Sequence, residues 1–209
     1  AQGRRTVPHP SDASRLPDWF RGRPVLRPER CPPGCAACVG ACPAGAIQAA
    51  PLRVDLGRCV FCTDCFQSCP TGALAPSPDH RLATTTRDDL RLDGSPARLA
   101  QAMDAATRRL LGRALRLRQV SAGGCNGCES ELATAGNVVW DMGRFGIQFV
   151  ASPRHADGIV VTGPVSANME AALRDTWIAV PSPRILIAVG ACAISGGVFR
   201  GSSQCRDGV

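Results

Sequence analysis

Cysteine is the residue type best able to do chemistry in this 209-residue chain, because eight of its twelve cysteines fall in two short runs. The runs extend from Cys31 to Pro43 and from Cys59 to Pro70, and each ends in Cys-Pro. Cysteine thiolates are soft, anionic metal ligands. Three closely spaced cysteines followed by a fourth, twice over, favour iron–sulfur clusters. Structural zinc is the alternative, but it usually takes two well-separated Cys-x2-Cys pairs.

The second run, Cys59-Val-Phe-Cys62-Thr-Asp-Cys65-Phe-Gln-Ser-Cys69-Pro70, resembles bacterial ferredoxins at every position of the pattern C-x2-C-x2-C-x3-C-P. The first run differs by one extra residue before Cys35. This resemblance implies two 4Fe–4S clusters, each bound by three cysteines of one run and the fourth cysteine of the other. The implied ligand sets are Cys31, Cys35, Cys38 and Cys69 for one cluster, and Cys59, Cys62, Cys65 and Cys42 for the other.

A third group of cysteines lies in the second half of the chain. The pair Cys125-Asn-Gly-Cys128 alone is ambiguous, because Cys-x2-Cys occurs in zinc sites, redox dithiols and clusters. Short Val- and Ile-rich runs alternate with a helical segment and predict a parallel sheet. The predicted strands are 117–120, 147–151, 158–162 and 185–189, with a helix over 167–178. Cys125 follows the first strand and Cys192 the last, so both fall at the edge where such sheets place their sites.

Residues 119–209 resemble the small subunit of nickel–iron hydrogenases and its relative in respiratory complex I. The motif Cys-x-Gly-Cys-x-x-Glu is matched by Cys125, Gly127, Cys128 and Glu131, and the stretches 152–165 and 190–197 are also similar. This resemblance implies a third 4Fe–4S cluster, with Cys125, Cys128 and Cys192 among its ligands, beside a large catalytic subunit. The Cys-Asn-Gly-Cys spacing is most similar to energy-converting hydrogenases and formate hydrogenlyases, since complex I subunits carry adjacent cysteines.

The fourth ligand of this third cluster is unidentified. In the family it lies in a later Gly-Cys-Pro-Pro element, and the neighbours of Cys205 do not match that element. The domain is therefore expected to be incomplete at its C-terminus or to lack one ligand. Glu131 matches the family motif and is a candidate proton relay, whereas Glu129 fits an acid at a helix N-terminus. His155 is assigned either a structural hydrogen bond or tuning of the cluster.

The domain organisation follows from these motifs. We expect an N-terminal arm over 1–24, a two-cluster ferredoxin domain over 25–78 and a hydrogenase small-subunit-like domain over 119–209. Residues 79–118 are predicted to be a linker and an amphipathic helix, which begins at Ser95-Pro96 and ends near Leu117. The predicted fold class is an α+β ferredoxin-like two-cluster domain followed by an α/β flavodoxin-like parallel-sheet domain.

Composition restricts the possible partners and cellular location of the protein. The net charge is +7 and every basic residue is arginine, but aromatic residues make up only 4% and do not alternate with the basic ones, so nucleic-acid binding is not expected. No apolar run of about 18 residues predicts a transmembrane helix, and the N-terminus does not read as a secretory signal. Twelve cysteines without a signal indicate metal binding in the cytoplasm.

The sequence therefore predicts an electron-transfer subunit of an oxidoreductase, relaying single electrons through three 4Fe–4S clusters. Its expected setting is a membrane-associated nickel–iron hydrogenase or formate hydrogenlyase-type complex, held at the cytoplasmic face by partner subunits. The expected partners are a large catalytic subunit, which would hold the catalytic centre, membrane-arm subunits and another ferredoxin-type donor or acceptor. Two alternatives are a complex I-like quinone oxidoreductase subunit and a free-standing iron–sulfur redox sensor.

Overall fold

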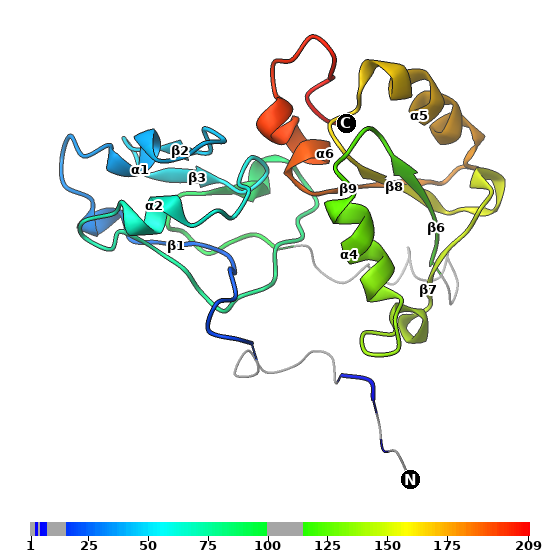
Figure 1. Cartoon of the computed structure of the whole chain (residues 1–209), viewed down its shortest axis with the longest axis horizontal. Helices are drawn as coiled ribbons and strands as arrows, with labels where there is room; N and C mark the ends of the chain where they lie inside the picture. Colours follow the sequence, from blue (N-terminus) through cyan, green and yellow to red (C-terminus); the bar gives the residue numbers. More distant parts are fainter. Residues whose placement is uncertain (1–2, 4, 8–15, 100–114) are drawn as a thin grey trace. The chain divides into compact units, whose positions relative to one another are not determined.

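The computed structural model describes residues 3, 5–7, 16–99 and 115–209. The chain divides into two compact units (Figure 1). The smaller unit comprises residues 11–101, and the larger comprises residues 102–209 together with the first ten residues. Each unit has its own set of cysteines, so each is described by itself.

The smaller unit is built from very short elements around the two cysteine runs. Its two antiparallel sheets pair β1 with β4, and β2 with β3 and then β5. The strands are β1 (Val25–Leu26), β2 (Ile47–Gln48), β3 (Arg53–Asp55), β4 (Leu74–Ala75) and β5 (Arg91–Leu92). Two single-turn helices lie within the runs, α1 (Ala37–Gly40) and α2 (Asp64–Gln67). Each is followed by a strand, so the internal repeat of the sequence is repeated in the structure.

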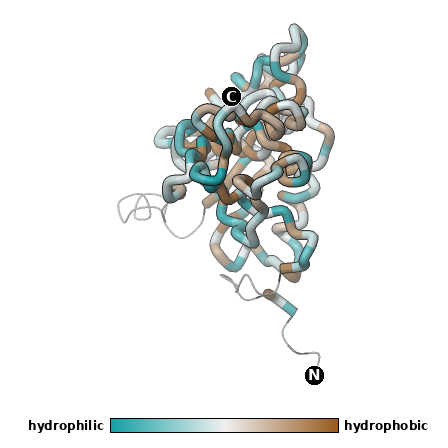
Figure 2. Tube along the Cα trace, turned by 90° about the vertical axis from the view of Figure 1, so that its left-hand side faces the viewer, coloured by the Kyte–Doolittle hydropathy of each residue, from teal (hydrophilic) through white to brown (hydrophobic). Residues whose placement is uncertain are grey.

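The core of the smaller unit is a thin apolar layer between these elements. Its most buried side chains include Leu52, Val54 and Leu74, each no more than 3% exposed. Figure 2 shows hydrophobic and hydrophilic segments alternating along the trace. Strands of two or three residues cannot bury enough apolar surface for much stability. Domains this small often depend on a bound metal or another cross-link for part of their folding free energy.

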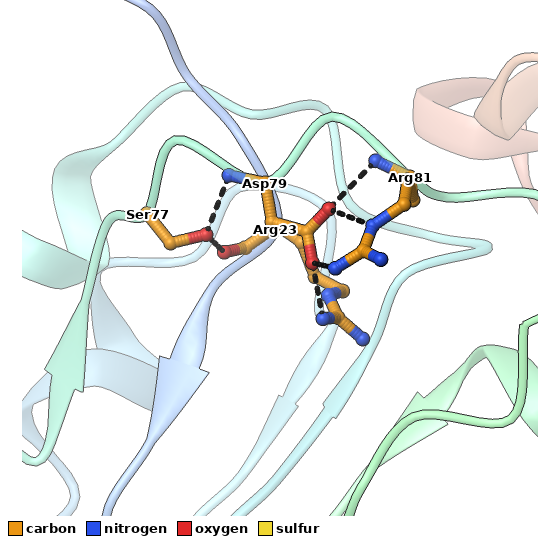
Figure 3. A network of polar contacts seen from close by, with 4 residues as sticks. All are labelled: Arg23, Ser77, Asp79 and Arg81. Atoms are coloured by element: carbon orange, nitrogen blue, oxygen red, sulfur yellow. Dashed lines mark hydrogen bonds and ion pairs between the residues drawn. The ribbon is translucent and has the colours of Figure 1, made fainter. Parts of the chain in front are cut away.

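A polar network fastens the segment before β1 to the segment after β4 (Figure 3). The Ser77 hydroxyl donates to the Arg23 carbonyl at 2.6 Å, and the Asp79 carboxylate accepts from the guanidinium groups of Arg23 at 2.5 Å and Arg81 at 2.9 Å. Hydrogen bonds from Arg81, with a further contribution from Arg23, hold the pKa of Asp79 below its ordinary value despite partial burial. Gly22 is buried here, and a Cβ at this position would lie 2.2 Å from the Ser77 carbonyl oxygen. The end of the predicted arm is thus packed into this unit.

The larger unit contains a four-stranded parallel sheet, as the sequence predicted, and its strand order is β7–β6–β8–β9. The strands are β6 (Leu115–Ser121), β7 (Ile147–Phe149), β8 (Gly158–Thr162) and β9 (Ile185–Val189). All five residues of β8 are buried, as expected for a central strand covered on both faces. The α-helices in the described part of this unit are α4 (Gly127–Ala135), α5 (Ala167–Ala179) and α6 (Ala191–Ser195).

The core of the larger unit lies between this sheet and α5. Ile159 and Val161 of β8 are fully buried and pack with Leu173 of α5. The predicted helix over 167–178 is therefore confirmed. The other elements are single 3-10 turns, η4 (Met142–Phe145), η5 (Pro153–His155) and η6 (Gly197–Phe199). Val7 of the N-terminal arm belongs to this unit, where its N–H donates to the Val139 carbonyl at 2.9 Å.

The prediction of an amphipathic helix from Ser95 to Leu117 is wrong at both ends. Residues 95–99 form no helix, and Leu117 lies in β6. Residues 100–114, which make up most of that predicted helix, lie outside the described part of the chain. In the described ranges, none of the helices combines the length and the apolar character needed to cross a bilayer.

Candidate iron–sulfur sites

The first cysteine set surrounds a cavity in the smaller unit. Cys31, Cys35 and Cys38 of the first run line it together with Cys69 of the second run. Burial raises the pKa of the Cys38 thiol, and the neighbouring thiols of Cys31, Cys69 and Cys35 raise it further. These four cysteines are the set that the ferredoxin resemblance implied for one cluster.

The second set surrounds a separate cavity lined by Cys42, Cys59, Cys62 and Cys65. The rest of its lining is mostly apolar and includes Ile47. Burial raises the pKa of the Cys65 thiol to about 12, and the thiols of Cys59, Cys42 and Cys62 add to this effect. Close packing of four thiols in apolar surroundings is unfavourable for their charged forms, and a bound cation would relieve that cost.

The last cysteine of each run, which lines the cavity formed by the other run, receives backbone hydrogen bonds. The Ala46 N–H donates to the Cys42 sulfur at 3.3 Å. At the equivalent position of the second run, burial raises the pKa of the Cys69 thiol, but N–H groups of Leu74, Thr71 and Ala73 outweigh burial and lower it. Such N–H donors stabilise a thiolate ligand and tune the potential of a cluster bound to it.

A tight turn accommodates the extra residue of the first run. In Pro32-Pro33-Gly34-Cys35 the Cys35 N–H donates to the Pro32 carbonyl at 3.1 Å, and Gly34 has a φ of +78°. Proline followed by a left-handed glycine at the two central positions is typical of a type II turn. The turn brings Cys31 and Cys35 to the same cavity despite the longer spacing.

The third set lies in the larger unit, where the loops after β6 and β9 meet. Gly190, which follows β9 directly, would place a Cβ only 2.4 Å from the Cys128 sulfur. Burial raises the pKa of Cys128, and the charges of Glu129, Cys192 and Cys125 raise it further. Cys125 is exposed, whereas Cys128 and Cys192 are half-buried. The expectation that Cys125 and Cys192 fall at one sheet edge agrees with this geometry.

Cys205 lies close to the third set. It pairs with Ser166 in an isolated β-bridge, and Ser166 contacts the loop before Cys125, where a Cβ on Gly123 would lie 2.9 Å from the Ser166 hydroxyl. Burial raises the pKa of Cys192, followed by the charge of Cys125 and, more weakly, that of Cys205. The sequence motif did not identify this proximity, because Cys205 lies outside the pattern that resembles the family.

The three sets are more open than a site for one ion. Among the described residues, no group of three or more His, Cys, Asp or Glu side chains lies close enough to hold a single metal ion. A four-iron cluster offers a separate iron to each cysteine, so its ligands are spaced more widely than those of zinc. The thiol chemistry and the lined cavities of the first two sets fit such a cluster.

The two candidate carboxylates of the third set have different surroundings. Glu131 lies within α4 and is exposed. Glu129 is half-buried and accepts hydrogen bonds from the hydroxyls of Ser121 and Thr162. Burial raises the pKa of Glu129, but hydrogen bonds from Ser121, Thr162 and its own N–H outweigh burial and lower it. His155 is exposed on η5.

Comparison with known proteins agrees with both regions. Residues 125–208 match the family model described as "NADH ubiquinone oxidoreductase, 20 Kd subunit", and residues 52–75 match the model of the 4Fe-4S binding domain. The second match contains the cysteines of the second run. The two models together span the third cysteine set and half of the smaller unit's cysteines.

Three relatives illustrate the similarity. The chain is 41% identical to formate hydrogenlyase subunit 7 of Escherichia coli over 46% of this chain and 38% of that protein. It is 41% identical to the probable membrane-bound hydrogenase subunit mbhJ of Pyrococcus furiosus over 44% and 54%, respectively. It is 45% identical to an NADH-quinone oxidoreductase subunit of Desulfovibrio desulfuricans over 35% and 40%. The matches thus span about half of each relative or less. The chain joins a 4Fe–4S-binding segment to a region similar to subunits of hydrogenase and complex I-like oxidoreductases.

Proposed function

We propose that this chain is an electron-transfer subunit that relays single electrons through three 4Fe–4S clusters. The observation that carries the proposal is the pair of cavities, each lined by three cysteines of one run and one of the other. A 4Fe–4S cluster supplies a centre that accepts and gives up one electron at a time. The first cluster would be held by Cys31, Cys35, Cys38 and Cys69, the second by Cys59, Cys62, Cys65 and Cys42, and the third by Cys125, Cys128 and Cys192.

The protein's own residues prepare these sites in two ways. Raised thiol pKa values, as at Cys65, mean that metal uptake must displace protons, so loading is favoured as the pH rises. Backbone N–H groups, such as that of Ala46, then donate to sulfur and stabilise the charged ligand. Apolar walls limit the access of water to the second site.

We further propose that the chain works in a membrane-associated hydrogenase or formate hydrogenlyase-type complex, at its cytoplasmic face. The names of two relatives and the Cys-Asn-Gly-Cys spacing support this assignment. The catalytic centre would then belong to a large partner subunit, with membrane-arm subunits as further partners. Exposed apolar side chains after α4 support a protein contact there, since Val138, Trp140 and Phe145 are each at least 50% exposed.

A complex I-like quinone oxidoreductase is the second candidate. It is favoured by the 45% identity to the NADH-quinone oxidoreductase subunit of Desulfovibrio desulfuricans. The two candidates share the same cysteine sets and differ in the terminal electron donor or acceptor. Nickel in the co-purified partner distinguishes them, because only the hydrogenase assignment requires it.

The decisive experiment is anaerobic purification of the native complex with metal analysis. The proposal predicts about twelve irons per chain, from three clusters of four, and nickel in a partner subunit. About eight irons would remove the third cluster from the proposal. Zinc in place of iron would overturn the electron-transfer function.

A further inference from the structure

Glu129 joins the ends of two strands to the loop that carries the third cysteine set. Its Oε1 atom accepts hydrogen bonds from the Ser121 hydroxyl at 2.6 Å and the Thr162 hydroxyl at 2.5 Å. Ser121 is the last residue of β6 and Thr162 the last of β8, and the two are paired in register. Adjacent parallel strands therefore present two hydroxyls side by side to a single carboxylate.

The surroundings of this carboxylate are tightly packed. Thr162 is fully buried. A Cβ on Gly124 would lie 3.3 Å from Glu129 Oε1 and 3.2 Å from the Gly163 Cα atom, so the backbone just before Cys125 contacts both the carboxylate and the end of β8. Loss of the carboxylate would remove the nearer acceptor of the buried Thr162 hydroxyl, whose other acceptor is the Val120 carbonyl at 3.5 Å. Glu129 thus holds the start of the cysteine loop against the sheet.

Among the described residues, the side-chain partners of the Glu129 carboxylate are uncharged. In the described ranges no arginine forms an ion pair with it, and its two side-chain partners are neutral hydroxyls. Because Glu129 directly follows Cys128 in the chain, its charge lies close to any cluster bound there and opposes the gain of an electron.

We propose that Glu129 is a positioning residue that fixes the Cys125–Cys128 loop on the ends of β6 and β8 and keeps a negative charge beside the third site, thereby lowering the reduction potential of the cluster bound there. The inference rests on the proposed function, because it requires a cluster at Cys125, Cys128 and Cys192. Reduction adds negative charge to the cluster, and a fixed carboxylate nearby opposes that addition. The sequence motif pointed instead to Glu131, which is exposed.

The test uses the full chain in its native complex, with potentials measured by redox titration monitored by electron paramagnetic resonance. In Glu129→Gln the amide oxygen still accepts the two hydroxyl hydrogen bonds, while the charge is removed. The expected result is full iron content and a more positive midpoint potential for one cluster only. Asp175→Asn is the matched control, because Asp175 is an exposed carboxylate on α5 of the same unit. It should leave all potentials unchanged.

Two further variants separate positioning from charge. Thr162→Val removes one buried donor and keeps the charge, so iron should be lost to a chelator several-fold faster from the third site while the potential stays near that of the parent. If Glu129→Gln does not load the third site, Glu129→Asp keeps the charge and must give a loaded site with a potential near the parental one.

Each failure has its own signature. A parental complex that lacks a third cluster signal contradicts the proposed function itself. A third cluster whose potential is the same in Glu129→Gln and Asp175→Asn contradicts the role of the charge. An unchanged rate of iron loss in Thr162→Val contradicts the positioning role.

Discussion

Substitution of Gly190 by alanine should remove the third cluster and leave the other two intact. Gly190 has φ +85° and ψ 156°, a conformation that is essentially restricted to glycine and costs other residues about 1–3 kcal/mol. In addition, the new Cβ would lie 2.4 Å from the Cys128 sulfur. Ordinary contacts between non-bonded heavy atoms are about 3.5–4.0 Å, so the sulfur has to move by roughly 1 Å. Ligand distances in metal sites hold within about 0.2 Å, and this displacement exceeds that tolerance.

The assay for Gly190→Ala is iron content together with the cluster signals of the reduced protein. We expect iron to fall from about twelve to about eight atoms per chain, with loss of one signal only. Gly136→Ala is the control, because Gly136 has a φ of −86° and its Cβ would make an ordinary 3.4 Å contact. It should retain all the iron. A Gly190→Ala protein with full iron and an unchanged third signal would refute the placement of Cys128 beside β9.

Three further predictions test other parts of the molecule. Cys31→Ser and Cys69→Ser should each lose one cluster, and the variant that combines them should lose no more than one. Combining Cys31→Ser with Cys42→Ser should instead lose two clusters. Additive iron loss on combining Cys31→Ser with Cys69→Ser would contradict their shared cavity. Glu131→Gln should slow proton-coupled turnover at unchanged iron content, and unaltered turnover would exclude a proton relay. Asp79→Asn should destabilise the protein by about 1–2 kcal/mol in denaturant unfolding, since it removes charge-assisted hydrogen bonds. Because folding lowers the pKa of Asp79, the contribution of this carboxylate to stability is present above its ordinary pKa of 3.8 and is lost as the pH falls below that value. Equal losses of stability in the parent and the variant on acidification would contradict this.

Much of the larger unit could be predicted because its signals are local. The runs around Ile159 and Ile187 are short, apolar and β-branched, and they form strands wherever a sheet can bury them. The incorrectly predicted helix before β6 shows a region where local signals are not sufficient. Leu115-Arg116-Leu117-Arg118 alternates with a period of two, which is a strand pattern, but these leucines also continued a helical spacing from the preceding residues. Only pairing with β7 and β8 decides between the two.

The environment of Glu129 could not be predicted from the sequence. Its two hydroxyl partners lie 8 and 33 residues away along the chain, and they meet only because β6 and β8 pair in one register. On the sequence alone, an acid in the first turn of a helix is adequately explained by the helix dipole. The cysteine sets of the smaller unit could be predicted more easily, because the spacing of the motif itself implies which cysteines of the two runs share a site.

The sharing of cysteines between the two cavities has a consequence for biosynthesis. When the ribosome has released the chain as far as Cys42, neither cavity has all four of the cysteines that line it. The second set becomes complete at Cys65 and the first only at Cys69, so both sites close within a few residues of elongation. If the two cavities hold the proposed clusters, a nascent chain interrupted between the runs would hold neither securely. Maturation of the proposed centres would then be coupled in time, and a fragment carrying only one run is not expected to serve as a one-cluster carrier.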